Sequence, residues 1–227
     1  PSRPLAFWIR YTIFSPRGNP AKAVGELWAI HFDGETGRIC ASKQQVPLNA
    51  CAFSEADLDV RIGSSTLADG RLEGSALSQE HYLSWSLTYD GEQPPLLLLP
   101  ESSYEAGFPK AKALVSRPLA AFSGSLTVDG RQEKIEAWVG SQNHNWGSQH
   151  TDDYAWGQVA GFDNAPDAFL ECSTARVRVG PVWTPRLTLL VLRSERGIGA
   201  AYRTGVAASR GDRVLLTADD LPFGATD

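Results

Sequence analysis

The feature that most restricts the fold of this chain is a series of short alternating segments separated by Asp-Gly turns. In residues 5–14, LAFWIRYTIF, the side chains of Phe7, Ile9, Tyr11 and Ile13 fall on one face of a strand. Asp-Gly between such segments is a strong signal for a β-hairpin. The turn signals are Asp33-Gly34, Asp69-Gly70, Asp90-Gly91, Asp129-Gly130 and Arg210-Gly211-Asp212. The pattern predicts an all-β protein of antiparallel sheets, arranged as a sandwich or barrel.

A proline-rich segment divides this pattern. With 227 residues, the chain is long enough for one large domain or two small ones. Residues 91–118 are rich in proline, which cannot donate a hydrogen bond to a sheet. We therefore predict an N-terminal β-unit over 1–110 and a C-terminal β-unit over 111–227. The second has few predicted strands, so it is either an open sheet or incomplete at its end.

Composition excludes several classes of protein. The net charge of −5, with no run of basic residues, argues against a nucleic-acid partner. The longest apolar run, residues 96–99, is too short to span a bilayer, so we predict no transmembrane segment. Cys40, Cys51 and Cys172 form no metal motif and no even disulfide set, which favours reduced thiols and a cytoplasmic location.

Two further questions stay open. The chain contains no Met, so a removed leader, and with it a periplasmic or secreted location, remains an alternative. A homo-oligomer is also an alternative, because an open β-unit has edges that need covering.

The richest segment chemically is residues 140–159, GSQNHNWGSQHTDDYAWGQV. A hairpin turning at 146–148 would place His144 opposite His150, with Asp152 on the same face. Two imidazoles and a carboxylate are a conceivable zinc or iron set. The spacing matches no known ligand signature, however, so we predict neither a metal nor a cofactor here.

The same segment is better explained as the wall of a pocket. One face of each predicted strand carries large side chains that can form hydrogen bonds, and the other carries mostly small ones. Aromatic rings mixed with a few polar groups are typical of a small-molecule pocket. A plug of polar groups that satisfy one another is the alternative. Glu171, on the next strand, is either a buried carboxylate or, as we favour, a residue at an exposed position. The residues predicted to bind a ligand are Glu136, Trp138, Trp146, Tyr154, Trp156 and Gln158.

The segment GSQNHNWGSQHTDDYAWGQVAGF, preceded by SGSLTVDGRQEKIEAWV, resembles the second half of the AttH/CrtC-like proteins, a group that includes carotenoid 1,2-hydratases. The segments FWIRYTIFSP, GELWAIHFD and LSWSLTYDG are similar to its N-terminal unit. The resemblance implies two lipocalin-like (calycin) β-barrel units packed together, with a cavity for an apolar ligand. It also implies addition of water to an isoprenoid double bond without an organic cofactor. His144 and Trp146 match the motif positions.

These inferences combine into a catalytic hypothesis. Protonation of an alkene needs a positioned acid, which a neutral carboxyl in an apolar pocket can supply. We assign this role to Asp152, or less favourably Glu136, with His144 or His150 as its partner. Aromatic faces would stabilise the cation by about 1–2 kcal/mol each. The product would be that of hydration, isomerisation or cyclisation. The alternative is a non-catalytic lipocalin-like carrier of an apolar or isoprenoid-like molecule. The supporting residues are Trp146, Trp156 and Tyr154 for the cation, and Gln158 or a histidine for the water.

Overall fold

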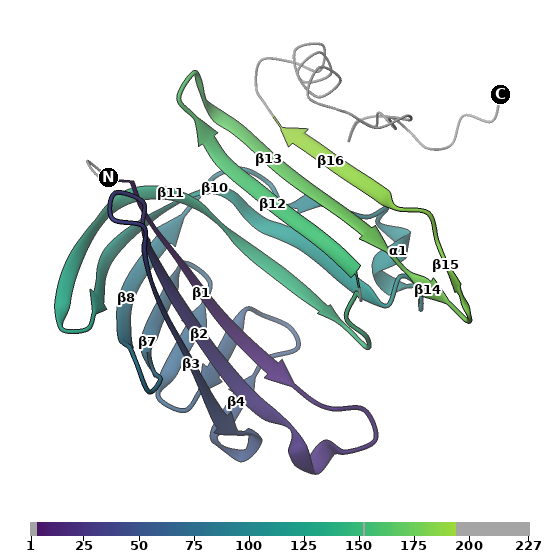
Figure 1. Cartoon of the computed structure of the whole chain (residues 1–227), viewed down its shortest axis with the longest axis horizontal. Coiled ribbons are helices and arrows are strands. Elements are labelled where there is room, and N and C mark those ends of the chain that lie inside the picture. The colour runs from purple at the N-terminus through teal and green to yellow at the C-terminus, as the bar shows by residue number, and fades with distance from the viewer. Residues whose placement is uncertain (1–3, 152, 194–227) are drawn as a thin grey trace. The chain divides into compact units, whose positions relative to one another are not determined.

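The computed structural model describes residues 4–151 and 153–193, and the regular secondary structure of this part of the chain is almost entirely antiparallel β-strand (Figure 1). This confirms the predicted all-β class. Within the described residues, no helix combines the length and the apolar character that crossing a membrane requires. The first strands are β1 (Leu5–Phe14), β2 (Val24–Asp33), β3 (Arg38–Pro47), β4 (Cys51–Phe53), β5 (Asp59–Ile62), β6 (Ser65–Ala68), β7 (Arg71–Leu77) and β8 (Tyr82–Asp90). The later elements are β9 (Leu96–Leu97), α1 (Ser102–Glu105), β10 (Ala111–Val128), β11 (Arg131–Gly147), β12 (Asp153–Phe162), β13 (Ala165–Arg176), β14 (Arg178–Val179), β15 (Val182–Trp183) and β16 (Leu187–Arg193). Two short 3-10 helices, η1 (Pro20–Lys22) and η2 (Leu48–Ala50), lie in loops.

The chain forms two compact units that alternate along the sequence. The first unit comprises the described residues of 1–92 and 120–139, and the second those of 93–119 and 140–227. The long strands β10 and β11 each contribute one part to the first unit and the other part to the second. A boundary between independently folding domains after residue 110 stays a prediction.

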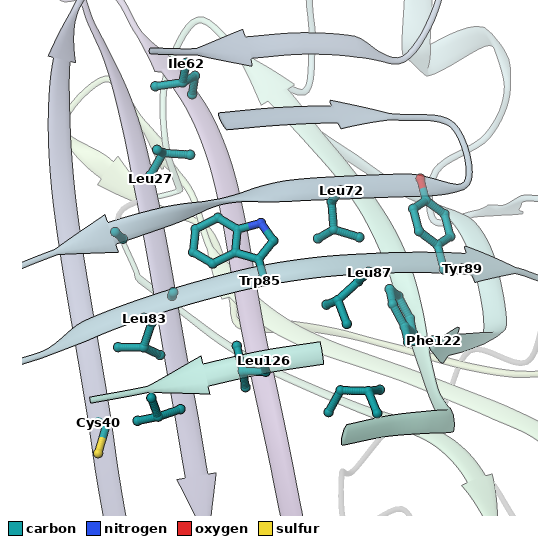
Figure 2. Close-up of a cluster of buried hydrophobic side chains, with 14 of the residues drawn as sticks. Leu27, Cys40, Ile62, Leu72, Leu83, Trp85, Leu87, Tyr89, Phe122 and Leu126 are labelled. Carbon is teal, nitrogen blue, oxygen red and sulfur yellow. The ribbon is translucent and has the colours of Figure 1, made fainter. Parts of the chain in front are cut away.

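The first unit is built from two antiparallel sheets around one core. One sheet has the order β1-β2-β3, and the other runs β11-β10-β8-β7-β6-β5-β4. The alternation in β1 holds, because Phe7, Ile9, Tyr11 and Ile13 all pack against the core cluster. Figure 2 shows that cluster, in which side chains of both sheets meet. Its buried members are Leu27, Ala29, Cys40, Ile62, Leu72, Ala76, Leu83, Trp85, Leu87, Tyr89, Ala120, Phe122, Leu126, Val128 and Ile135.

The Asp-Gly signals are confirmed as hairpin turns at three positions. Asp33-Gly34, Asp69-Gly70 and Asp129-Gly130 join β2 to β3, β6 to β7 and β10 to β11. At the third, both residues have positive φ, 51° and 84°, as a tight two-residue turn of primed type requires. Asp90-Gly91 is different, because β8 pairs with β7 and β10 and not with β9, the next strand in sequence. Residues 210–212 lie outside the described residues.

The second unit has its own sheet and its own apolar cluster. Its sheet has the order β12-β13-β16, all antiparallel (Figure 1). Phe169 of this sheet packs with Leu96 of β9 and Val115 of β10, and all three side chains are fully buried. Leu98, Leu119, Ala160 and Val191 pack around them. Because β9 pairs with β10 next to Val115, this cluster joins the β12-β13-β16 sheet to the start of β10.

Candidate functional site

The candidate site lies on one face of the β12-β13-β16 sheet. In the register of this sheet, Gln158 is opposite Glu171, and Glu171 is opposite Val191. Trp156 is opposite Ser173, one pair further along. Side chains of directly paired residues lie on the same face, and every second residue of a strand shares that face. Trp156, Gln158 and Glu171 therefore lie on the same face as the buried Phe169.

The carboxyl of Glu171 is the centre of a hydrogen-bond network. The Trp156 indole Nε1 donates to Glu171 Oε1, and Gln158 Nε2 donates to Glu171 Oε2 at 2.7 Å. The same Gln158 amide also contacts β11. Its Nε2 lies 3.3 Å from Asn143 Oδ1, and its Oε1 accepts from the Ser141 hydroxyl. Both oxygens of Glu171 thus have donors, and one of these donors is fixed in turn by a neighbouring strand.

The environment of Glu171 favours its neutral form. The residue is 2% exposed. Burial raises the pKa of the carboxyl above its usual range, and the hydrogen bonds from Gln158 and Trp156 offset this only in part. A carboxyl of this kind can hold a proton at a higher pH than an exposed glutamate. It can then donate that proton to a bound molecule, as a general acid does.

The side chains on the face around Glu171 change from buried at one end of the sheet to solvent-exposed at the other. At one end Phe169 is completely buried against Leu96 and Val115. At the other end Trp156 is 50% exposed and Tyr154 is 53% exposed. Tyr154, Trp156 and Gln158 alternate along β12 and so share this face. Three of the predicted ligand-binding residues are therefore brought together, with an acid at their inner end.

His144 and Trp146 lie on the opposite face of β11 from this network. Since Ser141 and Asn143 point to Gln158, alternation turns His144 and Trp146 the other way. The Trp146 ring stacks on Tyr104 of α1, with centroids 5.7 Å apart, and the His144 ring lies 4.8 Å from that of Trp146. Partial burial lowers the pKa of His144. In the second unit, the two motif residues thus form an aromatic ladder separate from the network of Glu171.

The hairpin that would have placed His144 opposite His150 is not formed. Strand β11 pairs with β10, and Ser148 N donates to Lys110 O at its end, whereas β12 belongs to another sheet. The zinc or iron set considered for these residues required that hairpin, and it is absent because β11 and β12, although consecutive in the sequence, belong to different sheets. His150 instead contacts Tyr154, with ring centroids 5.2 Å apart.

The remaining predicted site residues lie elsewhere. Asp152, the preferred acid, lies outside the described residues. Glu136 and Trp138 belong to the first unit. The carboxylate of Glu136 is exposed and forms an ion pair with Lys134 at 2.5 Å. Trp138 stacks on Phe7, with centroids 6.0 Å apart, against the core of that unit.

Glu171 is the residue that reasoning from the sequence considered but did not assign to the site. Its expected exposed position is wrong, since its side chain is buried. A signal was available in AFLECSTAR, where one carboxylate interrupts an otherwise weakly polar strand. That signal does not say which side chains will cover the carboxylate. Its partners Trp156 and Gln158 were identified, but the register that brings them to Glu171 depends on the fold.

Comparisons with known proteins support the fold. The structure is similar to that of a protein from Nitrosomonas europaea provisionally assigned as AttH, with a TM-score of 0.55 and 14% sequence identity over 86% of this chain. It is also similar to kievitone hydratase from Nectria haematococca, with a TM-score of 0.59 and 14% identity over 82% of this chain. The chain covers 64% and 56% of the lengths of these two proteins.

Comparison of the sequence with protein-family models gives no match. No curated protein matches it either. At 14% identity the two similarities establish the fold alone. That fold is the lipocalin-like one, and the resemblance read from the sequence pointed to the same group of proteins.

Proposed function

We propose that the second unit binds an apolar, isoprenoid-like molecule and hydrates one of its double bonds, with Glu171 as the acid. The observation that carries the proposal is a buried carboxyl beside half-exposed aromatic side chains. The fold shared with kievitone hydratase is consistent with this chemistry. Glu171 thereby takes the role that the sequence assigned to Asp152, which stays a candidate without a described position.

The proposed reaction needs no cofactor. The Glu171 carboxyl transfers its proton to the less substituted carbon of the alkene, which leaves a cation on the other carbon. Water adds to that cation and loses a proton to the Glu171 carboxylate. The net change is alkene plus water to alcohol, and the acid is regenerated. Each step uses one group already on the face described.

The neighbouring side chains have distinct roles in this proposal. The exposed ring faces of Trp156 and Tyr154 contact the apolar chain and stabilise the cation, by about 1–2 kcal/mol each if water is excluded. Gln158 orients the water, since its amide already lies against Glu171. The Trp156 indole donates to one carboxyl oxygen, so in this proposal that hydrogen bond breaks when the substrate reaches the acid.

The test is the Glu171→Gln variant. It keeps the size of the side chain and one acceptor oxygen, but it removes the acidic proton and replaces the second acceptor with an amide NH₂ group. Kievitone, the substrate named for the structural neighbour, and simple terminal isoprenoid alkenes serve as probes, with incorporation of ¹⁸O from labelled water as the readout. We expect wild-type turnover, a loss of about 100-fold or more in Glu171→Gln, and unchanged probe binding. Glu136→Gln is the matched control, because it makes the same change at an exposed carboxylate.

A carrier without catalytic activity is the second candidate, and one observation favours it. Both Glu171 oxygens already accept hydrogen bonds from the protein, as in a network that only orients a ligand. A carrier would bind the probes without incorporating ¹⁸O into them. Its Glu171→Gln variant would bind the probes more weakly. Full turnover in Glu171→Gln would remove this residue from the mechanism.

A further inference from the structure

Three residues with metal-binding side chains meet in the first unit, away from the residues that the proposed function uses. They are Cys40 on β3, His81 between β7 and β8, and Asp129 in the turn between β10 and β11. One ligand atom of each lies within 4.8 Å of those of the other two. Among the described residues, this is the one group of three or more such side chains that lie close enough together to hold a metal ion. Sequence spacing could not reveal it, since the three residues are 41 and 48 positions apart along the chain.

The fold holds each of these side chains in place. Cys40 is 1% exposed and belongs to the core cluster, where Figure 2 shows its sulfur at the edge of the drawn group. The Ser42 hydroxyl, two residues along β3, donates to the backbone oxygen of His81. Asp129 is fixed twice by Tyr82, whose backbone N donates to Asp129 Oδ1 at 3.0 Å and whose O accepts from Asp129 N at 2.9 Å.

The charges suit a cation. The Asp129 carboxylate accepts from the Tyr82 amide through Oδ1, and its Oδ2 faces His81 and Arg38. His81 Nδ1 lies 2.9 Å from Asp129 Oδ2. Arg38 competes for the same oxygen at 3.1 Å, but its side chain is 62% exposed and free to turn into solvent.

We propose that Cys40, His81 and Asp129 bind a divalent transition metal, with Zn²⁺ the best match. Thiolate, imidazole and carboxylate are all zinc ligands, and three of them with one water complete a tetrahedral site. Bond lengths of about 2.0–2.3 Å place the ligand atoms of such a site roughly 3–4 Å apart. The group therefore needs small side-chain movements only. On binding, the Cys40 thiol releases one proton to solvent, and the contact between His81 and Asp129 is replaced by two bonds to the metal.

Burial of the cysteine decides between this proposal and a nucleophilic one. Cysteine, histidine and aspartate also form catalytic triads, in which the sulfur must reach a substrate. The sulfur of Cys40 lies within the core and has no such access. A metal ion can approach from the other side, where the side chains of His81 and Asp129 are 19% and 31% exposed. The arrangement is thus that of a ligand set with one side open to solvent.

The test uses the whole chain, reduced and stripped of metal by a chelator. Zn²⁺ is titrated in competition with a chromophoric chelator, and Co²⁺ is titrated separately. We expect one Zn²⁺ per chain, and with Co²⁺ the near-ultraviolet absorption of a cobalt–thiolate bond. Cys40→Ser should lose that absorption. Cys51→Ser and Cys172→Ser are the matched controls and should keep it.

Two surface-side variants protect the test from a folding defect in Cys40→Ser. Asp129→Asn retains a residue type that tolerates positive φ, and His81→Gln changes a partly exposed side chain. Each should weaken Zn²⁺ binding at least about tenfold, since even residues that only support a metal ligand contribute that much. Absence of one-to-one binding at micromolar Zn²⁺ would overturn the proposal. So would affinity unchanged in Asp129→Asn and His81→Gln, or a cobalt absorption that survives Cys40→Ser.

Discussion

One tryptophan in each unit donates a side-chain hydrogen bond through its indole nitrogen, but one of the two is buried and the other is half exposed. Trp85 in the first unit is 4% exposed, and its Nε1 donates to the Tyr11 hydroxyl at 2.9 Å. That hydroxyl donates in turn to the backbone oxygen of Glu73 at 2.8 Å. Trp156 in the second unit is 50% exposed, and its Nε1 donates to the Glu171 carboxyl.

The difference lies in where each chain of hydrogen bonds ends. In the first unit it ends on a backbone carbonyl, and burial raises the pKa of Tyr11 far above its usual range, so no proton is exchanged near neutral pH. In the second unit it ends on a carboxyl whose pKa burial has raised. The first network stabilises a core. The second holds an ionisable carboxyl next to an exposed aromatic ring, as the proposed reaction requires.

The largest expected effect is the loss of stability when a buried phenylalanine is truncated in the core of either unit. Phe122→Ala in the first unit and Phe169→Ala in the second should each lower the free energy of unfolding by about 3–5 kcal/mol, because both side chains are buried. Phe14→Ala, at a 51% exposed position, is the control and should change it by less than about 0.5 kcal/mol. Urea denaturation followed by tryptophan fluorescence measures all three. A small effect of Phe169→Ala would show that the second unit lacks a packed core.

The next largest effect is a difference in stability between variants of the two tryptophans. Trp85→Phe should lower the free energy of unfolding by about 1–3 kcal/mol, since it leaves a cavity and removes a buried donor. Trp156→Phe should cost less than about 1 kcal/mol, because half of its surface already faces solvent. It should nevertheless raise the pKa of Glu171 further, since the indole hydrogen bond lowers that pKa. Equal losses of stability in the two variants would contradict the comparison.

The pH dependence of stability depends on Glu171. Its pKa is raised in the folded state, so the stability linked to its proton is fully present below the unfolded pKa and is lost as the pH rises through the folded pKa. The unfolding free energy of the wild type should therefore fall relative to that of Glu171→Gln over this interval. Denaturation curves of both proteins from pH 4 upward measure it. If the difference in unfolding free energy between the two proteins stayed constant as the pH rises, Glu171 would have an ordinary pKa.

The smallest effect is expected at the exposed pair of Lys134 and Glu136. Both side chains are largely in solvent, at 78% and 70% exposure, and such pairs contribute little. Lys134→Ala and Glu136→Gln should leave the urea midpoint and ligand binding within experimental error. A measurable loss of ligand binding in Glu136→Gln alone would restore Glu136 to the site predicted from the sequence.

The fold class could be predicted because it depends on local pattern. Alternation fixed the core face of Phe7, Ile9 and Tyr11, and positive φ at Asp129 and Gly130 suits the residues found there. The site depends on which strands pair across the fold, and local pattern does not contain that information. Ala137 in β11, at φ 50°, is one break in the regular strand geometry on which a parity argument relies. Parity could therefore predict Trp156 and Gln158 but not that they meet Glu171.

The most direct test of the account is the pKa of Glu171 itself. Glutamate labelled with ¹³C at the side-chain carboxyl gives one NMR resonance per residue, and the resonance missing in Glu171→Gln identifies this one. We predict that it titrates above the ordinary glutamate value of about 4.3, and higher still in Trp156→Phe. Titration at or below that value, or no response to Trp156→Phe, would contradict the assignment of Glu171 as a buried acid held for proton transfer.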